Sequence, residues 1–346
     1  MFEVVTSTDE SKSLREAQRI ADEVFFPAAL AVEKTDQVPE SHLSLLAEKG
    51  FYGLAAPEDL TTLDLPDYPA VKRVVELFAG SCLTTAFVWV QHHGAMMAAS
   101  KTENEAVRET YLADLASGQC RAGMAIGAAT RPGPPLLRAS AVDGGWMFDG
   151  EAPWVTGWGM VDTLHTAGRD DNDMLVWALL DAKDSESMSV EPLDMIAVQA
   201  SRTVTLRFSD YFVPRERVTG TQQRTAYIEG DPESLRFTGS LALGLADRAI
   251  SLMGDEGGRM TEELDAVRTL LAEAAPENVP AARAAGAEFA LRAAAALAVH
   301  DGSRSILTDA HAQRLVREAT FLLLFGSRPG IRSALLDNLT TPRHHG

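Results

Sequence analysis

Trp154-Val155-Thr156-Gly157-Trp158-Gly159 is the stretch that says most about the fold, because it places two tryptophans and a threonine among glycines. It follows Asp143-Gly144-Gly145-Trp146, which has the form of a hairpin turn between two strands. Aromatic faces stack on conjugated rings, glycine lets a backbone come close, and a threonine hydroxyl can bond to a ring heteroatom. The stretch therefore indicates a β domain that carries one wall of a site for a flat conjugated ligand.

The hydrophobic periodicity changes twice along the chain. Helical spacing runs from Thr8 to about Ser117, strand-like runs with turn residues follow from about Cys120 to Val218, and helical spacing returns after Gly220. The pattern predicts an α+β fold in three parts. These are an N-terminal helical domain (1–118), a central β-barrel domain (119–220) and a C-terminal helical bundle (221–346).

Several helix boundaries are readable within this pattern. Ser41 is the expected N-cap of a helix that stops at Gly50. Residues 86–99 are apolar almost all round, which predicts a buried helix. The alanine-rich residues 281–299 predict a helix that neighbours can approach closely.

Composition narrows the function classes. The formal net charge of −18 argues against nonspecific nucleic-acid binding, because phosphates repel an acidic surface. The two cysteines, Cys82 and Cys120, suit a reducing cytoplasm and are expected to be small buried residues rather than a disulfide or metal ligands. No run reads as a signal peptide or a membrane span. We therefore expect a cytoplasmic protein with no membrane, nucleic-acid or metal partner.

The chain resembles the acyl-CoA dehydrogenase family over most of its length, in segments that occur in the family's order. None of them is decisive alone, since Asp-Gly-Gly is simply a turn. The segments are Lys49 to Glu58 (KGFYGLAAPE), Gly118 to Pro132 (GQCRAGMAIGAATRP), Asp143 to Gly150 (DGGWMFDG) followed by Trp154-Val155-Thr156, and Val204 to Pro214 (VTLRFSDYFVP).

The resemblance implies an oxidoreductase and flavoprotein of fatty acid metabolism, with a helical domain, a β barrel and a C-terminal four-helix bundle. FAD would lie between barrel and bundle and across a subunit contact, near Thr130, Trp154, Val155 and Thr156. In such enzymes a carboxylate removes the proton α to the carbonyl of an acyl-CoA thioester while hydride leaves the β carbon. The electrons then pass to an electron-transfer flavoprotein.

The sequence departs from the family at the catalytic base. The usual glutamate would fall within Leu324-Phe325-Gly326-Ser327-Arg328-Pro329, which holds no acid. A second group of the family places its glutamate near the start of the first C-terminal helix, before a step that here is Leu243-Gly244. That position makes Glu233 the predicted base. The alternative is an acid that only stabilises the helix dipole.

Other family features are also altered. Thr130-Arg131-Pro132 replaces a Thr-Glu-Pro segment that helps to hold flavin and substrate. The family's Arg-x-x-Phe-Gly motif, which supplies a cation to the FAD phosphates, has no match, and Arg259 is its nearest substitute. Trp154 and Trp158 also suit a barrel core, and His92-His93 suit a hydrogen-bonded structural pair rather than a metal site.

Three functions remain open at this point. The first is an FAD-dependent dehydrogenase of acyl-CoA thioesters that acts as a homodimer or tetramer. The second is a companion subunit of a hetero-oligomeric acyl-CoA dehydrogenase, without its own base and part of its FAD site. The third is a flavin-dependent monooxygenase on the same fold, since a fold alone does not fix the chemistry.

Overall fold

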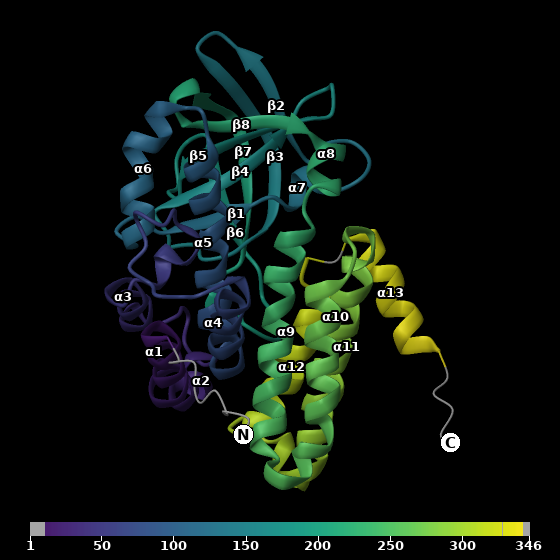
Figure 1. Ribbon diagram of the computed structural model, residues 1–346. Coiled ribbons are helices and arrows are strands. Elements are labelled where there is room, and N and C mark those ends of the chain that lie inside the picture. Colours follow the sequence, from purple (N-terminus) through teal and green to yellow (C-terminus); the bar gives the residue numbers. More distant parts are fainter. Residues whose placement is uncertain (1–10, 327, 342–346) are drawn as a thin grey trace, which may run out of the picture.

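The computed structural model describes residues 11–326 and 328–341, and it runs from helices through one sheet to helices again (Figure 1). The sheet forms one end of the molecule, the C-terminal helices form the other, and the N-terminal helices pack beside both. This is the predicted α+β architecture, which the structure confirms.

The N-terminal helices pack around α5, which is buried along most of its length as its apolar pattern predicted. Gly50, with φ of +78°, ends the turn after α3 in the left-handed conformation that glycine favours. The expected N-cap was wrong, because α3 begins at Glu40 after Pro39 and Ser41 lies inside its first turn. The helices are α1 (Lys12–Ile20), α2 (Phe26–Val32), α3 (Glu40–Glu48), α4 (Tyr68–Ser81), α5 (Leu83–Lys101) and α6 (Glu105–Ser117).

The central domain is an eight-stranded sheet in the order β6-β7-β3-β2-β4-β5-β8, with β1 paired in parallel to β4. Residues from β2 to β7 share one apolar core, so the sheet curls around its own interior. The predicted hairpin at Asp143-Gly144 joins β2 to β3, and Gly144 has φ of +78°. The elements are β1 (Ala122–Ala125), α7 (Gly127–Thr130), β2 (Leu137–Val142), β3 (Gly145–Val155), β4 (Thr163–Arg169), β5 (Met174–Asp181), β6 (Met188–Pro192), β7 (Val204–Pro214) and β8 (Val218–Gln223).

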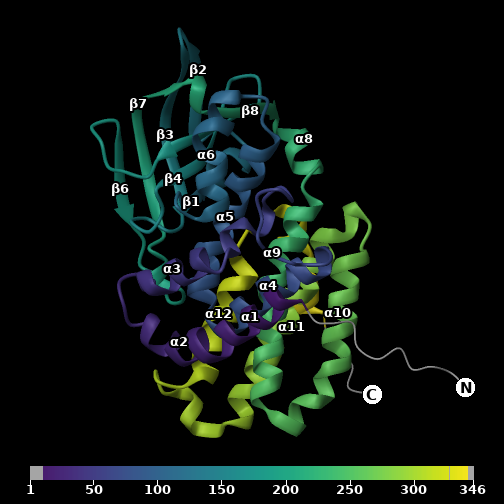
Figure 2. The same cartoon turned by 60° about the vertical axis from the view of Figure 1, so that its left-hand side comes forward.

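The C-terminal helices share a continuous apolar core with the N-terminal ones. In both ribbon views α4 lies beside α9 (Figures 1 and 2). The helices are α8 (Arg224–Glu229), α9 (Pro232–Leu252), α10 (Thr261–Glu273), α11 (Val279–His300), α12 (His311–Leu324) and α13 (Pro329–Thr340).

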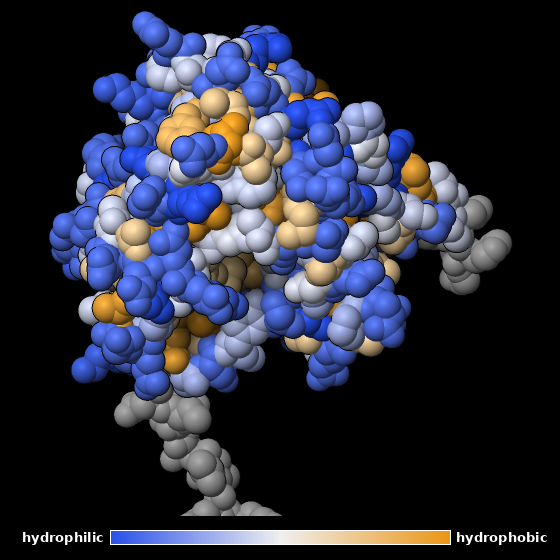
Figure 3. Space-filling model, turned by 90° about the horizontal axis from the view of Figure 1, so that it is seen from above, coloured by the Kyte–Doolittle hydropathy of each residue, from blue (hydrophilic) through white to orange (hydrophobic). Residues whose placement is uncertain are grey.

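The face seen at the sheet end is mostly hydrophilic, with apolar side chains in small separate areas (Figure 3). This agrees with a net charge of −18 over the full sequence. Among the described residues, no helix combines the length and the apolar character that a membrane crossing requires.

Two glycines set the distance between α4 and α9. A Cβ at Gly244 would overlap the backbone carbonyl of Glu76, and a Cβ at Gly80 would overlap the carbonyl of Gly244. The two helix backbones are therefore in direct contact, which only glycine permits.

Gly244→Ala is expected to lower the free energy of unfolding by about 1–3 kcal/mol or more, because the added methyl must push the two helices apart. Gly286→Ala on α11 is the matched control. Its Cβ would meet nothing nearer than 3.6 Å, so alanine should be neutral or stabilising by up to about 1 kcal/mol. Urea denaturation of both variants measures the difference, and equal stabilities would contradict the close packing.

Candidate functional site

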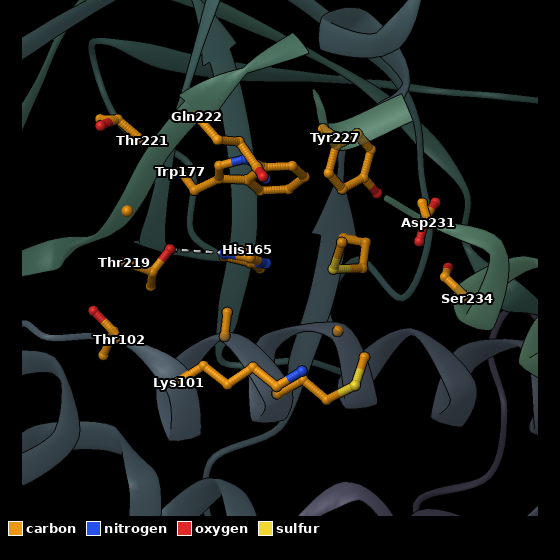
Figure 4. A pocket seen from close by; sticks show the side chains of 15 residues that line it. Lys101, Thr102, His165, Trp177, Thr219, Thr221, Gln222, Tyr227, Asp231 and Ser234 are labelled. Carbon is orange, nitrogen blue, oxygen red and sulfur yellow. Dashed lines mark hydrogen bonds between the residues drawn. The ribbon is translucent and has the colours of Figure 1, made fainter. Parts of the chain in front are cut away.

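A cavity of about 470 Å³ lies between the C-terminal half of α5, the outer face of the sheet and the start of α9 (Figure 4). Small residues on α5, Gly94 and Ala98, leave room for it, and β8 contributes Gly220, whose Cβ would meet nothing within 4 Å. This volume is typical of small-molecule sites.

Three rings form one wall of the cavity. The His165 and Trp177 rings stack with centroids 4.8 Å apart and an interplanar angle of 27°. Tyr227 on α8 continues the wall, with its ring centroid 5.2 Å from that of Trp177. His165 of β4 and Trp177 of β5 meet because Trp177 pairs with Ala167, two residues along β4 from His165, and such diagonal neighbours lie within reach of large side chains.

The wall carries hydrogen-bonding atoms without a partner. One ring nitrogen of His165, Nε2, lies 2.9 Å from the Thr219 hydroxyl oxygen. The other, Nδ1, and the Trp177 Nε1–H are buried and have no hydrogen-bond partner among the described residues. Burial also lowers the pKa of His165 to about 3, so the ring is neutral near pH 7. An unpartnered buried polar atom costs about 1–3 kcal/mol. Because both nitrogens are buried away from the cavity surface, a ligand in the cavity meets the faces of these rings rather than the two nitrogens.

Two charged side chains also line the cavity (Figure 4). Asp231 lies beside Tyr227 and near Ser234; its side chain is 11% exposed and ion-pairs with Arg328. Lys101 is an exposed residue in the last turn of α5, and no carboxylate partner lies within 4 Å of it among the described residues. The cavity is thus lined by one acidic, three aromatic and one basic side chain.

Glu233, the base predicted from the sequence, does not line this cavity. Its side chain is 66% exposed and ion-pairs with Arg236 one turn further along α9. Asp231 is the N-cap residue that precedes α9, with φ of −114° and ψ of 28°, whereas Glu233 lies in the first turn of the helix. The structure places Asp231, not Glu233, at the cavity.

The segment in which the usual family base would fall contributes Phe325 to an aromatic cluster. Phe325 lies 5.0 Å from Phe87 and 5.8 Å from Phe321, centroid to centroid. Its backbone carbonyl accepts a hydrogen bond of 3.0 Å from the buried Arg283 guanidinium. The sequence of residues 324–329 contains no Asp or Glu, so this segment itself supplies no carboxylate in place of the missing glutamate.

The residues predicted to hold the flavin lie around the end of β3. Trp154 is 57% exposed and has φ of +65°, a conformation that costs a non-glycine residue about 1–3 kcal/mol. Val155 is buried in the sheet's core, so only its backbone can meet a ligand. Thr156 is buried too, and its hydroxyl lies 3.1 Å from that of Thr203, a single contact that leaves it further hydrogen-bonding capacity.

Thr130 ends α7, which packs against β3 close to Trp154. A Cβ at Gly127 in this helix would sit 3.3 Å from the carbonyl oxygen of Pro153. The buried Arg169 guanidinium donates to the carbonyl oxygens of Arg131 and Gly133 and so holds the loop after Thr130. Arg131 of the altered Thr-Arg-Pro segment therefore contributes its backbone to a loop that a barrel arginine orders.

These residues fit a flavin in part. An aromatic face held outward on a strained backbone, beside an ordered loop, suits a conjugated ring. Arg259, the candidate for the FAD phosphates, is exposed in the turn before α10.

The other candidates have structural roles. The Nε2 of His92 lies 3.0 Å from the Leu115 carbonyl oxygen, and its Nδ1 accepts a bond of 3.1 Å from the Ala122 N–H. His93 is buried between aromatic rings, and among the described residues neither of its ring nitrogens has a hydrogen-bond partner. Of the two histidines, therefore, only His92 makes the hydrogen bonds that were expected of both. Within the described ranges, no group of His, Cys, Asp and Glu side chains could hold a metal ion.

Similarity to known proteins agrees with this arrangement. Residues 7–119 match the family model of the acyl-CoA dehydrogenase N-terminal domain. The chain is 25% identical over 231 residues to a mitochondrial 2-methylacyl-CoA dehydrogenase of Solanum tuberosum, covering 64% of this chain and 56% of that protein. It is 25% identical over 258 residues to a benzylmalonyl-CoA dehydrogenase of Aromatoleum aromaticum, covering 70% and 67%.

The fold also matches solved structures along nearly its whole length. A glutaryl-CoA dehydrogenase of Mycobacterium smegmatis in complex with FADH2 superposes with a TM-score of 0.82 at 13% identity, covering 95% of this chain and 93% of that one. By sequence, the matched part spans little more than half of the potato relative. The N-terminal family match, the curated relatives and the shared three-part fold together support an acyl-CoA dehydrogenase family member.

Proposed function

We propose that this chain binds FAD and dehydrogenates an acyl-CoA thioester whose acyl group enters the cavity beside α5. The observation that carries the proposal is Trp154, a large aromatic side chain that a strained backbone holds outward beside α7. Strain of this kind persists where the surrounding structure enforces it and is concentrated at ligand sites. A core tryptophan would not need it.

In this proposal Trp154 covers one face of the flavin, and the loop from Thr130 to Gly133 and the Val155 backbone border it. Bound FAD would supply the hydride acceptor. Asp231 is the carboxylate that lines the cavity and is the proposed base, while Glu233, the candidate from sequence, lies outside. An electron-transfer flavoprotein as acceptor, a homo-oligomer and a cytoplasmic location belong to the same proposal.

Trp154→Ala is expected to reduce FAD retention by about tenfold or more, since an aromatic stack in a desolvated site contributes on the order of 1.5 kcal/mol beyond area burial. Phe212→Ala is the matched control, because Phe212 is 48% exposed on β7 of the same sheet. Flavin absorbance per protein after gel filtration measures retention. Equal flavin content in wild type and Trp154→Ala would remove Trp154 from the site.

The function itself is tested by the visible spectrum of the purified chain. A yellow protein whose flavin is bleached anaerobically by an acyl-CoA supports the dehydrogenase. Rapid NAD(P)H consumption with a reductase and oxygen would instead support the monooxygenase.

A second candidate is a companion subunit that completes the site of a related chain. The observation that favours it is the aromatic packing of Phe325, Phe87 and Phe321 where the family's base would be. In this case the chain alone is colourless. It then acquires flavin only when co-expressed with a related subunit.

A further inference from the structure

We infer that the acyl group accepted by the cavity carries an aromatic ring, with an anionic substituent at the end distant from the thioester. This rests on the proposed function and specifies its substrate class. The aromatic, basic and acidic residues that line the cavity correspond to the ring, the anionic substituent and the thioester of such an acyl group.

The middle of the cavity is built for a flat group. His165, Trp177 and Tyr227 offer ring faces, and Figure 4 shows them gathered on one side of the space. Rings stack on rings with a geometric preference that saturated chains lack. A saturated chain gains only burial from the same surface.

The cavity gives an alkyl chain little room to extend between α5 and α9. His93 on α5 and Phe237 on α9 meet there, with ring centroids 5.8 Å apart. His93 lies one helical turn before Met97, which lines the cavity, and its ring also packs 4.6 Å from that of Trp89. His93 is buried and Phe237 partly buried, and their contact fills the space between the two helices at this point.

The cavity also carries one positive charge. Lys101, an exposed residue, lines it together with the Thr102, Thr219 and Thr221 side chains and has no carboxylate within 4 Å among the described residues. Asp231, the carboxylate of the lining, would repel an anion. The proposal therefore puts the anionic group beside Lys101 and the thioester beside Asp231.

The test compares three CoA thioesters with the flavin-loaded protein: 3-(4-carboxyphenyl)propanoyl-CoA, 3-phenylpropanoyl-CoA and octanoyl-CoA. Calorimetry gives Kd, and anaerobic bleaching gives the rate of flavin reduction. We expect the carboxyphenyl thioester to bind about tenfold more tightly than the phenyl one and the octanoyl thioester to bind most weakly, as expected for one charge-assisted contact.

Variants identify the residues responsible. Lys101→Met should remove the preference for the carboxylate and leave phenylpropanoyl binding unchanged, whereas Lys183→Met, on an exposed loop away from the cavity, should change neither. Trp177→Leu removes one ring face from the wall and should weaken both aryl thioesters several-fold while leaving octanoyl-CoA unchanged. If Trp177→Leu does not fold, Lys101→Met alone decides.

The outcomes separate this inference from the function beneath it. Bleaching that is fastest with octanoyl-CoA, with the tightest Kd, overturns the inference while the dehydrogenase proposal stands. Selective aryl binding without bleaching by any thioester keeps the cavity assignment and rejects the dehydrogenation. An unchanged carboxylate preference in Lys101→Met overturns the assignment of the distal charge.

Discussion

Asp231→Asn is expected to slow flavin reduction by an acyl-CoA about 10²–10⁴-fold, the range for removing a positioned general base. The reason is location: Asp231 is the carboxylate that lines the cavity, and its ion pair with Arg328 fixes its orientation. Asparagine has nearly the same shape, so FAD content and thioester Kd should change little. Stopped-flow absorbance under anaerobic conditions measures the rate.

Glu233→Gln is the matched control on the same helix turn. Its carboxylate is 66% exposed and pairs with Arg236, so its loss should leave the rate within about twofold of wild type. Because the Asp231–Arg328 pair also joins α9 to α13, urea denaturation of Asp231→Asn must accompany the kinetics.

Two results would contradict this assignment. A large loss in Glu233→Gln with a normal Asp231→Asn would restore the base that the family position predicts. Normal rates in both variants would mean that neither residue is the base, which is the result that the companion-subunit candidate requires.

The fold was largely predictable because local signals and the family motifs agree. The turn at Asp143-Gly144 needs a residue tolerant of positive φ, and the apolar pattern of residues 86–99 can be satisfied only in a core. Such features depend on near neighbours along the chain. The N-cap of α3 failed because Pro39 and Glu40 begin the helix before Ser41, and Pro is well suited to a helix start.

The cavity was not predictable in the same way. His165 and Trp177 lie on different strands and meet only through the register of β4 and β5, which the sequence of neither strand reveals. Asp231 lies two residues before Glu233, the base predicted from the sequence, yet choosing between them requires the backbone conformation at the start of α9. The outward turn of Trp154 likewise depends on a backbone conformation that its neighbours enforce.

The second large effect is loss of stability in mild acid, through buried neutral histidines. Burial lowers the pKa of His92 to about 3, against about 6.5 for an exposed histidine. Between pH 6.5 and pH 3 only the unfolded chain takes up a proton at His92. The contribution of His92 to the free energy of unfolding is therefore complete above pH 6.5 and falls by about 1.4 kcal/mol per pH unit as the pH decreases toward 3. The pKa values of His165, about 3, and His311, about 4, are lowered by burial with the same sign.

His92 shows why the proton is excluded. Its Nδ1 accepts from the Ala122 N–H and its Nε2–H donates to the Leu115 carbonyl, so the neutral ring joins α5 to the end of α6 and to β1. A protonated His92 would carry a hydrogen on Nδ1, and this N–H would face the N–H of Ala122, so that two donors would meet. One group acts in the opposite direction: burial raises the pKa of Glu318 to about 7, so the folded state binds that proton first.

His92→Gln separates these contributions, because glutamine can accept at one atom and donate at the other while remaining neutral at every pH. We expect the variant to be less stable at pH 7.5 but to lose about 1.4 kcal/mol less per pH unit between pH 6 and 4.5. His300→Gln, at the exposed end of α11, should keep the wild-type slope. Urea denaturation at pH 7.5, 6.0 and 5.0 gives the slopes. Parallel slopes for wild type and His92→Gln would mean that His92 protonates equally in the folded and unfolded chain, which its two hydrogen bonds and complete burial forbid.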